Sequence, residues 1–114
     1  MILGKVTGEV WATVKDPKLE GARLLVVQQT DVEGKPQGGF LVAVDSLNAG
    51  VGDAVLVAQG SSARQTDRTQ NRPVDAVIMA IVDRVDVQKI DDLDRDYRER
   101  SKRIDGMLAK QKET

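Results

Sequence analysis

The stretch ILGKVTGEVWATV, residues 2–14, alternates between two kinds of side chain, and this alternation decides the fold. Successive side chains of a β-strand point to opposite faces, so a period of two predicts a strand with one covered face. We therefore predict a long strand over residues 2–14. Its covered face carries the small and apolar side chains Val6, Gly8, Val10, Ala12 and Val14.

Four further stretches rich in Val, Leu and Ile predict strands, and glycine-rich segments separate them. The predicted strands are residues 24–29, 40–45, 54–59 and 74–87. Five strands with little helix favour a mainly β fold, and a barrel leaves no exposed sheet edge. We therefore predict a small, closed or partly closed five-stranded OB-like β-barrel.

The connections carry the usual turn residues. Residues 31–39 contain three glycines and a proline and predict a hairpin loop. Residues 46–53 predict a tight turn, with one helical turn at residues 46–49 as an alternative. The longest polar connection, residues 60–73, includes Ser61 and Ser62, either of which could cap one short helical turn.

The sequence changes character after residue 88. Residues 89–114 are dense in acidic and basic residues, and their apolar residues recur at spacings of three and four. We predict a barrel domain over residues 1–88 and a charged extension over residues 89–114, with an amphipathic helix from about residue 91 to 110. Because such a helix is marginal alone, we expect it to dock on the barrel, on a neighbouring subunit or on encapsulated cargo.

The composition narrows the function classes. The 114 residues include 17 Lys and Arg against 18 Asp and Glu, which gives no overall attraction to nucleic acid or to an acidic membrane. The absence of His and Cys removes the commonest general base, nucleophile and transition-metal ligands, so we predict no enzyme, no cofactor and no metal. No apolar run reaches membrane-spanning length, and polar residues interrupt the first ten positions, so we expect a soluble intracellular protein without a signal peptide.

Two polar clusters are candidate sites. Arg64, Arg68 and Arg72 could bind an anion, because guanidinium groups match carboxylate and phosphate geometry. A solvated loop, or salt bridges between subunits, is the favoured interpretation. The aspartates at strand ends could act as acids and bases or bind a hard cation, but turn and cap roles explain them more simply. These aspartates are Asp45, Asp53, Asp75 and Asp83.

Trp11 lies on the polar face of the first predicted strand. It could stack on a base, but barrels that bind nucleic acid usually combine several aromatic residues with a basic groove. This chain has one Trp, one Phe and one Tyr. An exposed Trp is therefore better explained as an anchor in an interface between subunits.

Several of these segments, in this order, resemble the EutN/CcmL family, the pentameric vertex proteins of carboxysomes and other bacterial microcompartments. The resemblance covers about residues 1–87. Asn48 stands where the family pattern has a glycine, and the tail after Val87 is longer than usual. The matching segments are residues 1–15, 24–28, 42–45, 49–57, 60–64, 73–78 and 81–83.

The resemblance implies a structural protein of the bacterial cytoplasm, located in a microcompartment shell. Its homopentamers would cap the vertices of a shell made otherwise of hexameric proteins. A narrow opening at the fivefold axis, more simply explained as a sealed or incidental hole, would be formed by Gly60, Ser61, Ser62, Ala63 and Arg64. Interfaces with other subunits or tiles would include Trp11, Arg68 and Arg72.

Two other functions are weighed against this one. A single-stranded nucleic-acid-binding OB module would use Arg64, Arg68 and Arg72 and bind in a salt-sensitive way. A small hydrolase would depend on Asp45 and Asp75, although the sequence offers no nucleophile and base to pair with them. The balanced charge disfavours nucleic acid as a partner of either the barrel or the tail.

Overall fold

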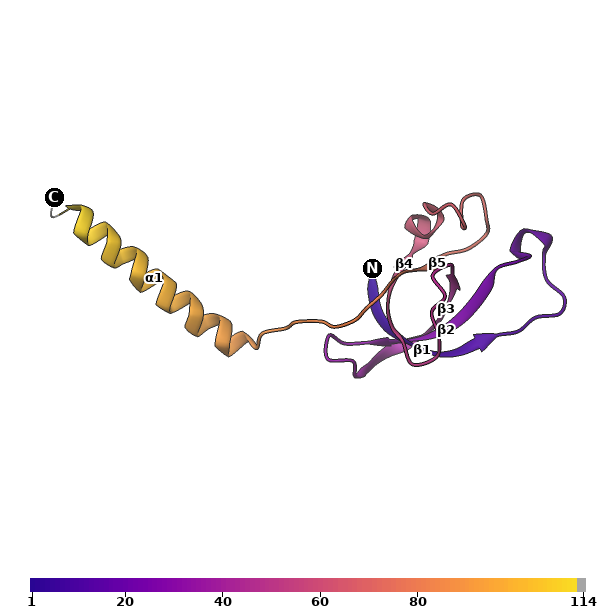
Figure 1. The fold of residues 1–114 in the computed structure, drawn as a ribbon, viewed down its shortest axis with the longest axis horizontal. Helices are drawn as coiled ribbons and strands as arrows, with labels where there is room; N and C mark the ends of the chain where they lie inside the picture. The colour runs from indigo at the N-terminus through magenta and orange to yellow at the C-terminus, as the bar shows by residue number, and fades with distance from the viewer. Residues whose placement is uncertain (113–114) are drawn as a thin grey trace.

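The computed structural model describes the backbone of residues 1–112 and the side chains of residues 1–108. It is a closed five-stranded β-barrel with a C-terminal helix, which confirms the predicted class (Figure 1). The predicted extension runs to residue 114, and its last two residues lie outside the described part. The elements in chain order are β1 (Ile2–Val10), η1 (Pro17–Leu19), β2 (Arg23–Thr30), β3 (Pro36–Asp45), β4 (Ala54–Gln59), η2 (Gly60–Arg64), β5 (Ala76–Ile81) and α1 (Ile90–Lys112).

The strands close in the order β1-β2-β3-β5-β4, so that β4 returns to β1. All neighbours are antiparallel except β3 and β5, which pair in parallel at Val44 and Val77. A parallel pair needs a crossover, and here the crossover from β3 to β5 runs through β4, η2 and the polar loop after η2. This crossover carries the residues predicted for the fivefold axis.

The predicted bounds of three strands are wrong, and the ladder explains the main difference in each strand. β1 ends at Val10, which pairs with Leu24 near the start of β2, so residues 11–14 have no strand beside them. β5 covers residues 76–81 because its last ladder contact is the Val82 amide donating to the Ala54 carbonyl. β3 instead begins early, at Pro36, because the hairpin stays paired. An alternating pattern forms a strand only where a partner lies alongside.

Two predictions about turns also need correction. Residues 46–49 form no helical turn. Instead, Asp45 Oδ1 accepts hydrogen bonds from the amides of Leu47 and Ala49, at 3.0 and 3.3 Å. The short helical turn after β4 is confirmed as η2, but its N-cap is Gln59 and no side chain caps it, so the predicted serine cap is wrong.

Two apolar clusters hold the barrel together. The main cluster fills the interior with inward-facing residues of every strand, among them Val6, Leu25, Ala43, Val57 and Ile78. The second cluster lies on the outer face of β3, β4 and β5, where η2 and the loop after it cover the sheet. Its buried members are Val44, Ala58, Ala63, Val74 and Val77.

Helix α1 confirms the predicted amphipathic helix and extends it slightly at both ends. The linker after β5 has no regular structure and carries the helix away from the barrel, so the molecule measures 78 × 28 × 21 Å (Figure 1). The expected docking of α1 along its own barrel is therefore wrong. No helix in the described part of the chain combines the length and hydropathy needed to cross a bilayer.

Candidate assembly surfaces

The segment predicted for the fivefold axis is η2, at one end of the barrel (Figure 1). Gly60 adopts a φ of 67°, a left-handed conformation that favours glycine, and its amide donates to the Asp75 carbonyl at 2.7 Å. This hydrogen bond fixes η2 to the start of β5. Ser61 and Ser62 are exposed. The tip of η2 therefore presents two small hydroxyl side chains to its surroundings.

Ala63 does not belong to that exposed tip. Its side chain is fully buried in the second cluster, against the outer face of the sheet. Its side chain therefore faces the barrel, and the placement of Ala63 near a fivefold axis stays a prediction. The small size of Ala63 lets η2 pack closely on Val44 and Val77, which positions Ser61 and Ser62.

The three arginines of the polar loop do not form one site. Arg64 donates to the Val74 carbonyl at 3.4 Å and borders a shallow hollow with Gln65, Gln70 and Asn71, whereas neither Arg68 nor Arg72 lines that hollow. Arg72 donates to the Glu20 carbonyl at 3.4 Å and so links this loop to the β1–β2 connection. Arg68 is exposed. Separate positions of this kind suit individual contacts with a neighbouring protein better than one anion site.

Trp11 lies just beyond the end of β1, in the long β1–β2 connection that projects from the barrel (Figure 1). Its position on a strand face was predicted wrongly. With 84% of its surface exposed, it is among the most exposed large apolar residues of the chain. Its role as an interface anchor stays a prediction.

An apolar surface that the sequence analysis missed lies across β2 and β3. Val26 and Val42 face each other on these strands, and Phe40 lies two residues before Val42 on the same side. Phe40 is 67% exposed and Val42 47% exposed. We call Val26, Phe40 and Val42 the β3 patch. The signal in the sequence was the apolar residue at every second position on the outer face, where a solvated strand would carry polar residues.

A second missed surface lies on the other side of the barrel. Leu3 of β1 faces Leu56 of β4, and Leu56 faces Ala80 of β5, so the three form a row across the strands. All three are half-buried in the single chain. We call this row the β4 patch. Contiguous exposed apolar surface of this kind marks sites of association between proteins.

Asp45 confirms its predicted structural role. Its carboxylate, 1% exposed, accepts from Arg23 Nη1 at 2.7 Å and from backbone amides of the following turn. Arg23 Nε also donates to Glu9 Oε1 at 3.1 Å, and Arg23 Nη1 to the Ala49 carbonyl. The hydrogen bond to Glu9 is the main cause that raises the pKa of Arg23 above its ordinary value. This network joins three strands and the β3–β4 turn.

The other three aspartates at strand ends do not gather with Asp45 into a cluster that could act in acid–base catalysis. Asp53 Oδ2 accepts from the Gly50 amide at 2.8 Å, which closes the turn before β4. Asp75 and Asp83 are exposed. Among the described residues, no three acidic side chains gather in a way that could hold a metal ion. The arrangement offers no basis for the hydrolase alternative.

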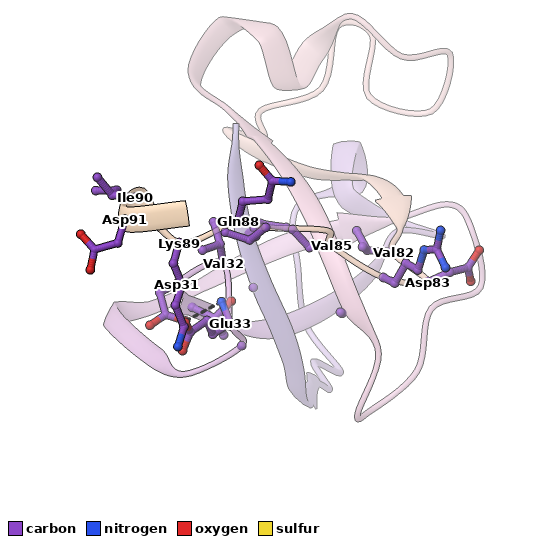
Figure 2. A pocket seen from close by; sticks show the side chains of 17 residues that line it. Asp31, Val32, Glu33, Val82, Asp83, Val85, Gln88, Lys89, Ile90 and Asp91 are labelled. Carbon is purple, nitrogen blue, oxygen red and sulfur yellow. Dashed lines mark hydrogen bonds between the residues drawn. The ribbon is translucent and has the colours of Figure 1, made fainter. Parts of the chain in front are cut away.

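A hollow of about 730 Å³ lies between the start of β1, the β2–β3 turn and the linker before α1. Figure 2 shows Val32 close to the linker, with Asp31 and Glu33 at the turn. The Asp31 carboxylate is engaged by its own turn, accepting from the amides of Glu33 and Lys35, both at 2.9 Å. The wall of this hollow is open and mainly apolar, and it offers no nucleophile paired with a base.

The chain resembles known proteins over its barrel. The family model described as "Ethanolamine utilisation protein EutN/carboxysome" matches residues 1–83. The carboxysome shell vertex protein CcmL of Synechococcus elongatus is 44% identical over 88 residues, which cover 77% of this chain and 89% of the relative. The bacterial microcompartment shell vertex protein EutN of Salmonella typhimurium is 45% identical over 85 residues, or 75% of this chain and 86% of the relative.

Solved structures agree with these relatives. CcmL of Nostoc sp. PCC 7120 superimposes with a TM-score of 0.74 at 44% identity, covering 77% of this chain and 93% of that one. GrpN, a pentameric microcompartment shell protein from Rhodospirillum rubrum, has a TM-score of 0.68 at 40% identity and covers 78% of this chain and all of that one. The family match ends before α1.

Proposed function

This chain belongs to the EutN/CcmL family, and we propose that it is a non-enzymatic structural protein whose pentamers cap the vertices of a bacterial microcompartment shell. The observation that carries this proposal is the match of the whole closed barrel to shell vertex proteins and to a pentameric microcompartment shell protein. A layer of hexameric proteins needs fivefold positions in order to close. Hexameric shell proteins are therefore the partners at its rim.

The two apolar patches support a ring. A closed ring uses a heterologous interface, in which two different surfaces of each chain meet. The β3 patch and the β4 patch lie on different sides of one barrel. We therefore assign the interface to contact between the β3 patch of one subunit and the β4 patch of the next. Trp11, Arg68 and Arg72, at the exposed loops, are assigned to the rim of this interface or to contacts with neighbouring tiles.

The tip of η2 is assigned to the fivefold axis. Gly60, Ser61 and Ser62 are small, and small residues allow five backbones to approach one another. Arg64, exposed at the C-terminal end of η2, lies beside this tip. Ala63 supports the tip from beneath through its buried packing.

The nucleic-acid-binding alternative gains no support. The aromatic residues are on three separate elements: Trp11 in the β1–β2 connection, Phe40 on β3 and Tyr97 on α1. They form no common stacking platform, and the formal net charge is −1. The OB-like topology alone therefore does not favour that function.

The oligomeric mass tests the proposal. Light scattering on a sizing column should give five times the chain mass of 12.4 kDa, because the apolar patches leave water on assembly. Val42→Asp places a charge in the β3 patch and should give monomers. Gln37→Asp, at an exposed position on the same strand but outside the patch, is the matched control and should remain a pentamer. A monomeric parent protein at all concentrations would overturn the proposal.

A further inference from the structure

Helix α1 carries an exposed apolar seam with heptad spacing. Ile90, Leu93, Tyr97, Ile104 and Met107 follow one another at intervals of three, four, seven and three residues. In a coiled coil these are a and d positions, which face a partner helix. Arg100 occupies the one d position that is not apolar. The five apolar side chains are 44–75% exposed, so the seam has no cover in the single chain.

Within the described residues, no side chain of the barrel or linker covers this seam. The helix stands clear of the barrel at the end of the linker (Figure 1). A solitary helix of this length is marginal in water and gains most of its stability from packing. Within the described part of α1, the one ion pair is between Arg95 and Asp92, which lie on the face opposite the seam.

We infer that α1 pairs with α1 of a second copy of this chain as an antiparallel two-stranded coiled coil. Apart from Leu108, the apolar residues between positions 90 and 108 occupy only a and d positions, and such a narrow stripe is typical of a coiled-coil seam. In the antiparallel register in which Leu93 faces Ile104 of the other helix, Ile90 faces Met107. Every apolar seam residue except Tyr97 then meets an apolar partner.

Arg100 and the charges beside the seam select the antiparallel direction. In a parallel pair, Arg100 would face Arg100 of the other helix and two like charges would be pressed together. In the antiparallel register, Arg100 instead faces Tyr97, where a guanidinium can lie on the aromatic ring. The same register places Asp96 of each helix beside Arg103 of the other along one edge of the pair, so two pairs of opposite charge flank the centre.

The symmetry of this pair determines which copies it joins. An antiparallel helix pair has a twofold axis, and neighbours in a fivefold ring are not related by one. The pair therefore links chains of two different rings. The inference goes beyond the proposed shell function and does not depend on it, because the heptad seam belongs to a helix outside the family match.

Cysteine cross-linking tests the register directly, because the chain has no cysteine of its own. In a double variant, Leu93→Cys with Ile104→Cys, oxidation should convert nearly all chains to disulfide-linked dimers. The two sites in one helix are about 16 Å apart, too far for a disulfide within the chain. Either single variant should remain monomeric on a non-reducing gel, and an equal mixture of the two should cross-link.

The control pair is Asp91→Cys with Lys102→Cys, which keeps the spacing of 11 residues but lies on outer heptad positions. It should cross-link at least tenfold more slowly. Cross-linking of Ile104→Cys alone would show a parallel pair, and equal rates for the control would show random collision. Either result, or no cross-linking at all, would overturn the inference.

Mass measurement keeps this result separate from the proposed function. If the protein is pentameric but the double variant does not cross-link, the helix pairing is wrong and the shell function stands. If the double variant cross-links specifically but no pentamer forms, the reverse holds. Where both are right, raising the concentration should add a species of ten chains, which Ile104→Asp removes while five-chain rings remain.

Discussion

At Gly4 the barrel has no room for a side chain. Gly4 pairs with β2, and a Cβ atom placed on it would lie 2.9 Å from the Gln28 carbonyl oxygen and would also meet Val27 Cγ1. A backbone oxygen cannot move aside without disturbing the ladder. We therefore predict that Gly4→Ala lowers the free energy of unfolding by about 1–3 kcal/mol, measured by urea denaturation.

Gly39→Ala is the matched control for this variant. Gly39 also lies in a strand, has no left-handed φ, and has open space where its Cβ would be. Its free energy of unfolding should stay within about 0.5 kcal/mol of the parent. Equal effects of the two substitutions would show that close strand contact at Gly4 is not the cause.

The Arg23–Asp45 pair gives a second prediction at this scale. Arg23→Met leaves the buried Asp45 carboxylate without its cationic partner, so the melting temperature should fall clearly. Adding Asp45→Asn to that variant should recover part of the loss, because the amide is neutral and its oxygen still accepts from the Leu47 amide. Calorimetry of the parent, both single variants and the double variant measures the coupling, and strictly additive losses would contradict it.

The raised pKa of Arg23 also predicts a pH range in which this residue does not change the stability of the barrel. A group whose pKa is higher in the folded state contributes stability that is fully present below its unfolded pKa and is lost as pH rises through the folded value. For arginine this loss lies in strong alkali, because the pKa of Arg23 is raised above an ordinary value that is already strongly alkaline. Titration of Arg23 itself therefore leaves the stability of the barrel unchanged through the neutral range.

Asn48 shows how much of a turn conformation can be predicted from the sequence at one position. The resemblance led us to expect a glycine there, and the structure gives Asn48 a φ of 62°, in the left-handed region. Asn is among the few other residues that adopt this conformation readily. The departure from the pattern could be seen in the sequence, but the compatibility of Asn with the turn required the backbone angle.

At the scale of elements, all five strands and the helix were predictable, whereas their ends were less so. β4 was predicted correctly because turns bound it at both ends. β1 and β5 were predicted too long, because alternation continues past the last residue that has a strand beside it. The β3 and β4 patches were missed for a related reason. A single sequence does not show which face of a barrel strand points outward.

Helix α1 yields a prediction of its own. Because it stands clear of the barrel, removal of residues 89–114 should leave the melting temperature of the barrel within about 2 °C of the parent protein, by scanning calorimetry at a concentration too low for rings to pair. By contrast, a deletion that also removes the buried part of β5 should unfold the barrel. A large fall in melting temperature on removal of α1 would mean that the helix packs on the barrel after all.

At the scale of the whole molecule, the shape of the assembly follows from having two different patches on one chain. In chains that also carry Ile104→Asp, so that α1 cannot pair, Val42→Asp damages only the β3 patch and Leu56→Asp damages only the β4 patch. Each variant alone lacks one half of the interface and should be monomeric, provided that circular dichroism shows a folded barrel. The undamaged patches of the two variants are nevertheless complementary.

An equal mixture of Val42→Asp and Leu56→Asp chains should therefore give heterodimers of twice 12.4 kDa and nothing larger, by native mass spectrometry. One intact interface can form between the two variants, and both outer ends are then blocked by a buried charge. A symmetric interface, in which each patch contacts its own copy, would behave differently. Each single variant would then retain one complete contact and dimerise by itself, which would exclude the head-to-tail ring.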